Sequence, residues 1–162
     1  MKLAAEAPLW LALVFALLLV AGAAEDAARL RISNWTCALI LVGAVVGIFV
    51  VGPEAGVWQN FVVFGALLAV GTPLFAAGKM GGGDVKLLAV SGLWFDLEGG
   101  LLMLISVLLA GGVLALLILA LRMASWSESA RNRWQLLKPG AGVPYGVAIA
   151  AGALIATTLL RA

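Results

Sequence analysis

GKMGGGDVKLLAV, residues 78–90, joins two long apolar runs, one ending near Ala77 and the other beginning at Val85. Three consecutive glycines, an aspartate and two lysines stand at this junction, where a membrane protein ordinarily keeps charge scarce. The apolar runs predict membrane helices, and the glycine stretch predicts the loop between them. A carboxylate kept at such a place is a functional candidate. The residue to be explained is therefore Asp84.

The composition is that of an integral membrane protein. The chain has 162 residues, of which 64% are hydrophobic and 11% are charged, and its mean hydropathy is +1.15. Soluble domains have roughly 45–50% apolar and about 25% charged residues. The sequence therefore predicts a single all-α transmembrane domain over residues 1–162.

Six apolar segments divide the chain. They lie at Leu9–Ala24, Thr36–Val51, Val57–Ala77, Val85–Leu97, Leu101–Leu121 and Val143–Leu160. About 20 helical residues cross a hydrocarbon core of about 30 Å, so the third, fifth and sixth segments are long enough. The first two are near the lower limit, and the fourth crosses only if it takes in Gly81–Asp84 or the bilayer is locally thin. We expect a polytopic bundle of about six transmembrane helices.

Tryptophan and charge indicate where these helices end. Four tryptophans fall at expected helix ends: Trp10, Trp35, Trp58 and Trp94. Amphipathic rings collect at the headgroup level. Eight of the ten basic residues lie in alternate connections: Arg29, Arg31, Lys79, Lys86, Arg122, Arg131, Arg133 and Lys138. By the positive-inside rule, these connections face the cytoplasm and both termini face outside.

Two segments have alternative interpretations. The apolar run Leu9–Val20 and the small residues after it are similar to a cleavable signal peptide, but Glu6 and the arginines that follow favour a retained first helix. Residues 122–140 mix basic residues with tryptophan and leucine, which predicts a helix lying in the cytoplasmic interface. A solvated basic loop is the alternative for this second segment.

The residue types exclude most hydrolytic chemistry. The chain has no histidine, which removes Ser-His and Cys-His nucleophile pairs and histidine metal sites. Its single cysteine, Cys37, cannot form an intrachain disulfide or a cysteine zinc site, and we expect it to be a packing residue. We therefore expect neither a metal nor a cofactor. Carboxylates, lysines and backbone groups are what is left for chemistry.

Two carboxylates stand at helix ends that could converge: Asp26 after the first helix and Asp84 before the fourth. Two close carboxylates cannot both ionise, and a shared proton leaves one acid and one base around a single water. Such a pair can hydrolyse a peptide bond without histidine, serine or metal. The macrodipole of the fourth helix would favour ionised Asp84 as the base. A plain N-capping aspartate is the alternative interpretation.

Two motifs resemble those of a known family. The stretch Gly81-Gly-Gly83-Asp84-Val-Lys86-Leu resembles the GxGDxKL signature of the type IV prepilin peptidases, which are membrane aspartyl proteases of the GxGD class. The stretch from Asp26 to Ile32-Ser33-Asn34 is similar to the family's aspartate followed by basic residues and Ile-Pro-Asn. A weaker similarity is Val143-Pro144-Tyr145-Gly146 at the start of the last helix.

The resemblance implies a peptidase of the cytoplasmic (inner) membrane that removes the short basic leader of prepilins or pilin-like proteins on the cytoplasmic side. It implies that Asp26 and Asp84 are catalytic, that Gly81 and Gly83 shape the loop, and that Lys86 supports the loop or an acidic residue of the substrate. Arg31 and Asn34 would support the first motif. The expected partners are a pilin-like substrate, the lipid bilayer and the pilus assembly machinery, with no nucleic acid.

Two features leave other interpretations open. Ser33 stands where the family usually has proline, so the rigid φ of proline is lost after Asp26. The chain also lacks the paired CxxC motifs of the larger family members that methylate their product, so the resemblance is to the compact form. A six-helix transporter or channel component with Asp26 and Asp84 as ion sites, or an inactive membrane assembly subunit, are the alternative functions.

Overall fold

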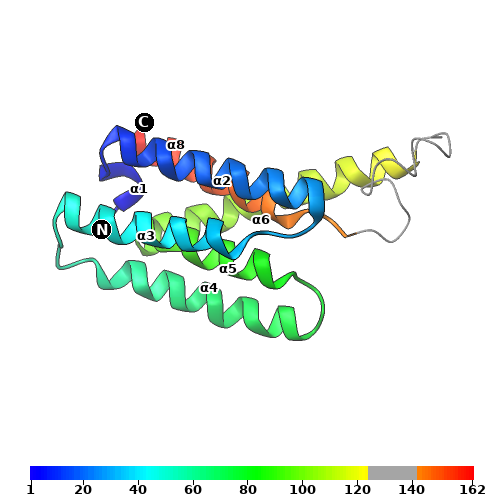
Figure 1. Ribbon diagram of the computed structural model, residues 1–162, viewed down its shortest axis with the longest axis horizontal. Helices are drawn as coiled ribbons and strands as arrows, with labels where there is room; N and C mark the ends of the chain where they lie inside the picture. Colours follow the sequence, from blue (N-terminus) through cyan, green and yellow to red (C-terminus); the bar gives the residue numbers. More distant parts are fainter. Residues whose placement is uncertain (124–141) are drawn as a thin grey trace.

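The computed structural model describes residues 1–123 and 142–162, and this part of the chain is an elongated bundle of helices (Figure 1). Its helices are α1 (Leu3–Glu6), α2 (Leu9–Arg29), α3 (Asn34–Val51), α4 (Trp58–Ala76), α5 (Gly82–Gly92), α6 (Leu97–Met123) and α8 (Tyr145–Arg161). The described residues contain no strand. The predicted all-α bundle is therefore confirmed.

All six expected helices are present, and the differences in the bounds of the first and the fourth affect the site. The first continues to Arg29, so that Asp26 lies inside α2 instead of after it. The fourth begins at Gly82 and ends at Gly92, which leaves it 11 residues long. A short helix that the sequence did not predict, α1, precedes α2.

Four helices, α2, α3, α4 and α6, are long and apolar enough to cross a membrane. The chain is therefore a multi-pass membrane protein. By contrast, 11 residues of α5 rise only about 16 Å, roughly half of a hydrocarbon core. The fourth segment was expected to cross only with the help of Gly81–Asp84 or of a locally thin bilayer; α5 does take in Gly82–Asp84, but it ends at Gly92 and is too short to be one of the four candidate spans.

Tight contacts hold α5 against α4. A Cβ at Gly71 of α4 would lie 2.6 Å from Val85 Cγ1, and one at Gly92 would lie 2.6 Å from Leu67 Cδ1. The small residues let the two helices approach closely, as in other membrane bundles. Since Val85 follows Asp84, this packing also sets where the carboxylate lies.

The turn after α5 is packed into the core. Trp94 is buried and stacks on Phe15 of α2, with ring centroids 4.1 Å apart, while its indole N–H donates to the Ile40 carbonyl at 3.2 Å. The expectation that Trp94 lies at the headgroup level is therefore wrong. Trp10, Trp35 and Trp58 are exposed, as interfacial rings would be.

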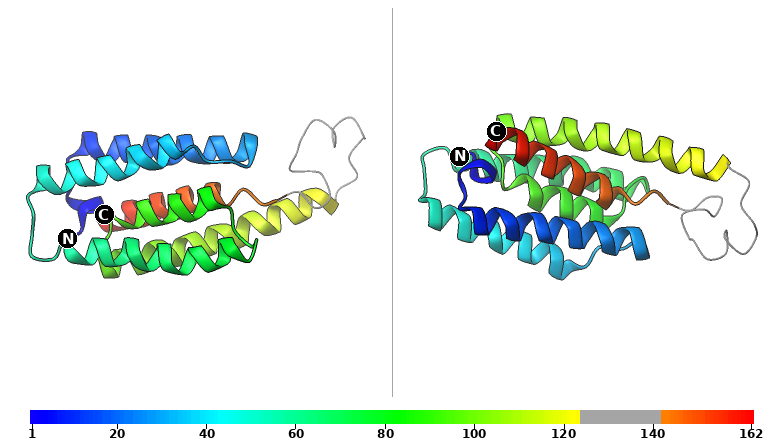
Figure 2. Two further views of the ribbon diagram at one scale, coloured as in Figure 1. Left: turned by 60° about the horizontal axis from the view of Figure 1, so that its bottom comes forward. Right: turned by 90° about the horizontal axis from the view of Figure 1, so that it is seen from above.

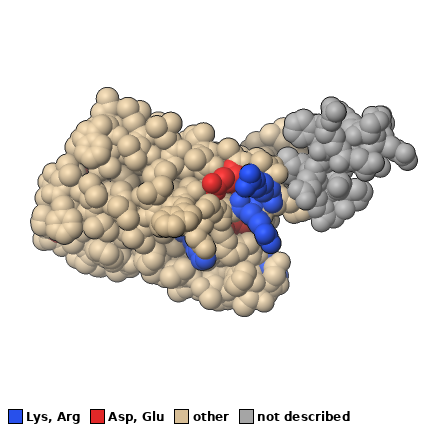
Figure 3. Space-filling model, in the orientation of Figure 1, with Lys and Arg blue, Asp and Glu red and all other residues tan. Residues whose placement is uncertain are grey.

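The two chain termini lie at one end of the bundle, and several basic residues lie at the other end. Arg161 donates to the carbonyls of Ala4 and Ala7, so both termini lie at one end (Figure 2). The α2–α3 and α4–α5 connections lie at the other end, where Arg29 ends α2 and the connections hold Arg31 and Lys79. On the face drawn in Figure 3, the charged side chains gather toward that end.

Part of the charge prediction lies outside the described residues. Arg122 belongs to the last turn of α6. The other basic residues of the predicted interfacial helix, Arg131, Arg133 and Lys138, lie outside the described part of the chain, as do Trp126 and Trp134. The prediction for that segment therefore stays a prediction.

Candidate active site

The structure brings the two expected aspartates to the same end of the bundle. Asp26 lies near the C-terminus of α2 and is 3% exposed, and Asp84 lies in the first turn of α5 and is 8% exposed. Isolated charges are costly in such places unless they have partners. Both carboxylates have the backbone of one residue, Gly146, as a neighbour.

The Gly146 N–H donates a hydrogen bond of 2.7 Å to Asp26 Oδ2. Gly146 is in the first turn of α8, which begins after Pro144, and the first N–H groups of a helix have no partner within the helix. A side chain would not fit here, because a Cβ on Gly146 would lie 2.9 Å from Asp26 Oδ2 and 2.9 Å from Ile32 Cδ1. Glycine thus lets the α8 N-terminus reach Asp26.

The Asp84 carboxylate folds back over Gly81. A Cβ at Gly81 would lie 2.7 Å from Asp84 Oδ2, so only glycine leaves room for this conformation. Burial raises the pKa of Asp84, the negative charge of Asp26 raises it further, and hydrogen bonding to the backbone of Gly81 and Gly146 lowers it less, so that the pKa is about 6. Asp84 therefore keeps its proton more readily than an ordinary aspartate.

Ile32, in the α2–α3 connection, packs between the glycines of two other elements. Its Cβ lies 3.1 Å from where a Cβ on Gly83 would be, and its Cδ1 lies 2.9 Å from the corresponding point on Gly146. The α2–α3 connection, the glycine loop and the start of α8 therefore meet around one side chain. Gly83, predicted to shape the loop, is one of the positions that allow this approach.

The serine in place of proline keeps a proline-like backbone. Ser33 has φ −67°, close to the roughly −65° that a proline ring imposes. Its N–H donates to Glu25 Oε2 at 2.8 Å, and its side-chain oxygen accepts from the Trp35 N–H at 3.2 Å as the N-cap of α3. Ser33 therefore keeps a φ that a proline at this position would also have.

Of the predicted supporting residues, Lys86 and Asn34 bind each other, whereas Arg31 has no partner in the described part of the chain. Lys86 donates to Asn34 Oδ1 at 2.9 Å, which ties α5 to the start of α3. Arg31 is exposed and forms no hydrogen bond or ion pair with residues 1–123 or 142–162. In the same described part of the chain, no three Cys, Asp or Glu side chains lie close enough together to hold a metal ion. Cys37 is buried and free.

Sequence reasoning did not include Gly146, Ile32 or Glu25 among the site residues. The available signal for Gly146 was Pro144, since proline is common at the start of a helix and free N–H groups follow it. The signal for Ile32 was its place in the stretch Ile32-Ser33-Asn34, which resembles a family motif, whereas no signal pointed to Glu25, whose contacts are made around the turn.

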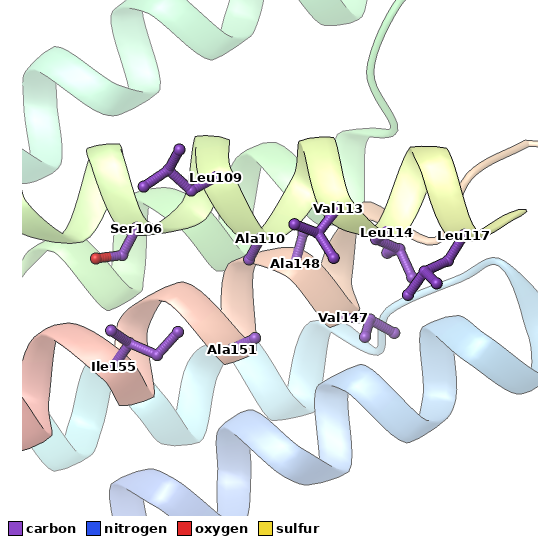
Figure 4. Close-up of a pocket in the computed structure, with 10 residues that line it drawn as sticks. All are labelled: Ser106, Leu109, Ala110, Val113, Leu114, Leu117, Val147, Ala148, Ala151 and Ile155. Carbon is purple, nitrogen blue, oxygen red and sulfur yellow. The ribbon is translucent and has the colours of Figure 1, made fainter. Parts of the chain in front are cut away.

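A hollow of about 460 Å³ lies near this site, between α6 and α8 (Figure 4). It begins at Val147, next to Gly146, and Ser106 is the one polar residue in its lining. It holds no titratable group, so it is not where acid–base chemistry takes place.

Residues 13–116 match the type IV leader peptidase family, and this range covers both Asp26 and Asp84. The chain belongs to this family. It is accordingly a leader-peptidase-like protease of the membrane, and the family implies pilin-like substrates. No curated protein and no solved structure matches the chain.

Proposed function

We propose that this protein is an aspartic endopeptidase of the GxGD class that removes the basic leader from type IV prepilins or pilin-like proteins, with Asp26 and Asp84 as its catalytic pair. The observation that carries the proposal is the burial of both carboxylates at one end of the bundle, beside the same Gly146 N–H. Family membership supports the peptidase activity.

In the proposed mechanism Asp84 holds the shared proton and Asp26 is the base. The sequence favoured the opposite assignment through the dipole of α5, but burial and the Asp26 charge raise the pKa of Asp84 to about 6 in spite of that dipole. The Gly146 N–H stabilises ionised Asp26. The two groups are coupled, so the pair titrates as a unit.

The proton transfers balance over one turnover. Asp26 takes a proton from the water as its oxygen attacks the peptide carbonyl carbon, and Asp84 gives its proton to the carbonyl oxygen. Asp26 then passes its proton to the amide nitrogen, the C–N bond breaks, and Asp84 recovers a proton from a hydroxyl of the tetrahedral intermediate. Gly81 and Gly83 leave room for the Asp84 carboxylate and for Ile32 to pack against the loop that carries Asp84.

We place the pair at the cytoplasmic face of the cytoplasmic (inner) membrane, with both termini outside and residues 1–162 forming one peptidase domain. Arg29, Arg31 and Lys79 lie at the end that holds the two aspartates, as cytoplasmic loops require. The leader is then cut on the side where pilins meet the assembly machinery. The topology is tested in Cys37→Ser protein by labelling new cysteines at Lys79 and Glu54 with a membrane-impermeant thiol reagent in intact cells; only the Glu54 position should react.

The function is tested by expressing the protein with a pilin-like substrate in cells that lack other leader peptidases. We expect a shorter substrate whose new N-terminus lies directly after the basic leader. Uncut substrate, with normal membrane abundance of the protein, would favour a transporter or an inactive assembly subunit instead.

A further inference from the structure

Glu25, the residue before Asp26, is tied to the connection that follows α2. Its Oε2 accepts from the Ser33 N–H at 2.8 Å, and its two carboxylate oxygens lie 3.2 and 3.3 Å from the Thr36 hydroxyl. Thr36 is buried, and its Cγ2 lies 3.4 Å from the position of a Cβ on Gly22. Glu25 thus joins the end of α2 to the start of α3.

This carboxylate holds the residue that has replaced proline. A proline ring fixes φ covalently, whereas serine can leave the proline-like region freely. The chain itself uses proline at the same position of other helices: Pro8 and Pro144 are the N-caps of α2 and α8, with φ −53° and −73°. Ser33 is the N-cap of α3 with φ −67°, and its N–H, which proline would lack, is the group that Glu25 binds.

The α2–α3 connection, which Glu25 binds at Ser33, contacts the two catalytic elements through Ile32. Ile32 directly precedes Ser33 and packs between Gly83, next to Asp84, and Gly146, whose N–H binds Asp26. A loop that left its proline-like conformation would withdraw this side chain from both glycines. Ile32 would then no longer fix the distance between the N-terminus of α8 and the glycine loop.

We propose that Glu25 is a positioning residue: its hydrogen bond to the Ser33 N–H replaces the covalent constraint of proline and keeps Ile32 between the two catalytic elements. This inference rests on the proposed peptidase function. It assigns Glu25 no contact with the substrate.

The test compares Glu25→Ala, Ser33→Pro and the double variant, using purified protein and a pilin-like substrate. We expect Glu25→Ala to lower kcat by about tenfold to a hundredfold with KM changed less than about twofold, because misplaced reacting groups slow the chemical step. Ser33→Pro should stay within about threefold of wild type, since the ring supplies the constraint. The double variant should recover to about the Ser33→Pro rate, and Glu25→Gln, which keeps an acceptor oxygen, should stay close to wild type.

Two results would overturn the proposal: a double variant as slow as Glu25→Ala, or a Glu25→Ala defect that appears in KM. An inactive Ser33→Pro variant would also contradict it.

Limited trypsin digestion at Arg29 and Arg31 tests the positioning role of Glu25 independently of peptidase activity. Faster cutting of Glu25→Ala, reversed in the double variant, supports the positioning role, and equal rates in all variants refute it. If the wild-type protein cleaves no pilin-like substrate, the proposed function is refuted, whatever the result of the trypsin digestion.

Discussion

The Gly146 N–H donates a 2.7 Å hydrogen bond to Asp26, across 120 residues of chain. Through this bond the last helix, α8, reaches the carboxylate that α2 carries, and the same backbone acts on Asp84 of α5. Two helix N-termini, those of α5 and α8, therefore point at the proposed catalytic pair. Their N–H groups compensate for part of the cost of placing two carboxylates together.

Adding a side chain at Gly146 should disable the pair. In Gly146→Ala the new Cβ would lie 2.9 Å from Asp26 Oδ2 and Ile32 Cδ1, so α8 must move away from Asp26. We expect kcat to fall by about tenfold to a hundredfold, as misplaced catalytic groups cause. Gly112→Ala in α6 is the matched control, because no atom lies within 4 Å of its Cβ position. Equal activity of the two variants would refute the role of the Gly146 contact.

Activity should depend on the protonation of Asp84. The pKa of Asp84 is raised to about 6, so the proton that it donates in the mechanism is lost as the pH rises through that value. We expect kcat/KM to fall with increasing pH above about 6, approaching tenfold per unit. A profile measured with purified protein from pH 5 to 9 checks this. A rate that keeps rising up to pH 9 would contradict Asp84 as the acid.

Removing the Asp84 charge should stabilise the protein at high pH. The folded state binds this proton more tightly than the unfolded state, so the free energy of unfolding falls as the pH rises from about 4 to about 6 and levels off above that. Asp84→Asn avoids that loss. We expect a gain of up to roughly 3 kcal/mol at pH 8 that disappears near pH 4, measured by thermal unfolding in detergent. A stability gain of Asp84→Asn that increased toward acid pH would contradict a raised pKa of Asp84.

The contact between α4 and α5 should be sensitive to a single methyl group. In Gly71→Ala the new Cβ would lie 2.6 Å from Val85 Cγ1, which overpacks the helix pair. We expect destabilisation of about 1–3 kcal/mol and a loss of activity, since Asp84 precedes Val85. Val85→Ala in the same protein should restore most of both. The prediction fails if the second substitution makes the first worse.

The number and order of the described helices after α1 could be predicted, because each of them contains most of one of the apolar runs of the sequence. The bounds of α2 and α5 could not, since Glu25 and Asp26 looked like the end of a helix but have partners in Ser33 and Gly146. Leu93–Phe95 looked like a continuing helix, yet Trp94 turns inward to stack on Phe15.

The candidate site was predicted in part for a similar reason. Asp26 and Asp84 are rare charges in an apolar chain, and a family resemblance pointed to both. Lys86 and Asn34 were each named as supporting residues, but the hydrogen bond between them was not predicted. The weak motif similarity of Val143–Gly146 pointed to this region, but Gly146 acts through its backbone N–H, which every residue except proline has, so its bond to Asp26 could not be predicted.

In the proposed function, Asp26 and Asp84 work as one catalytic pair. The most direct measurement is the cleavage rate of a pilin-like substrate by purified Asp26→Asn and Asp84→Asn, with Asp96→Asn as the matched control. Asp96 is also buried, but its carboxylate accepts from the Gly99 N–H at 2.9 Å at the start of α6, at the other end of the bundle. Both pair variants should lose cleavage while remaining folded, and Asp96→Asn should cut at close to the wild-type rate. Cleavage by either pair variant at the wild-type rate would contradict the account.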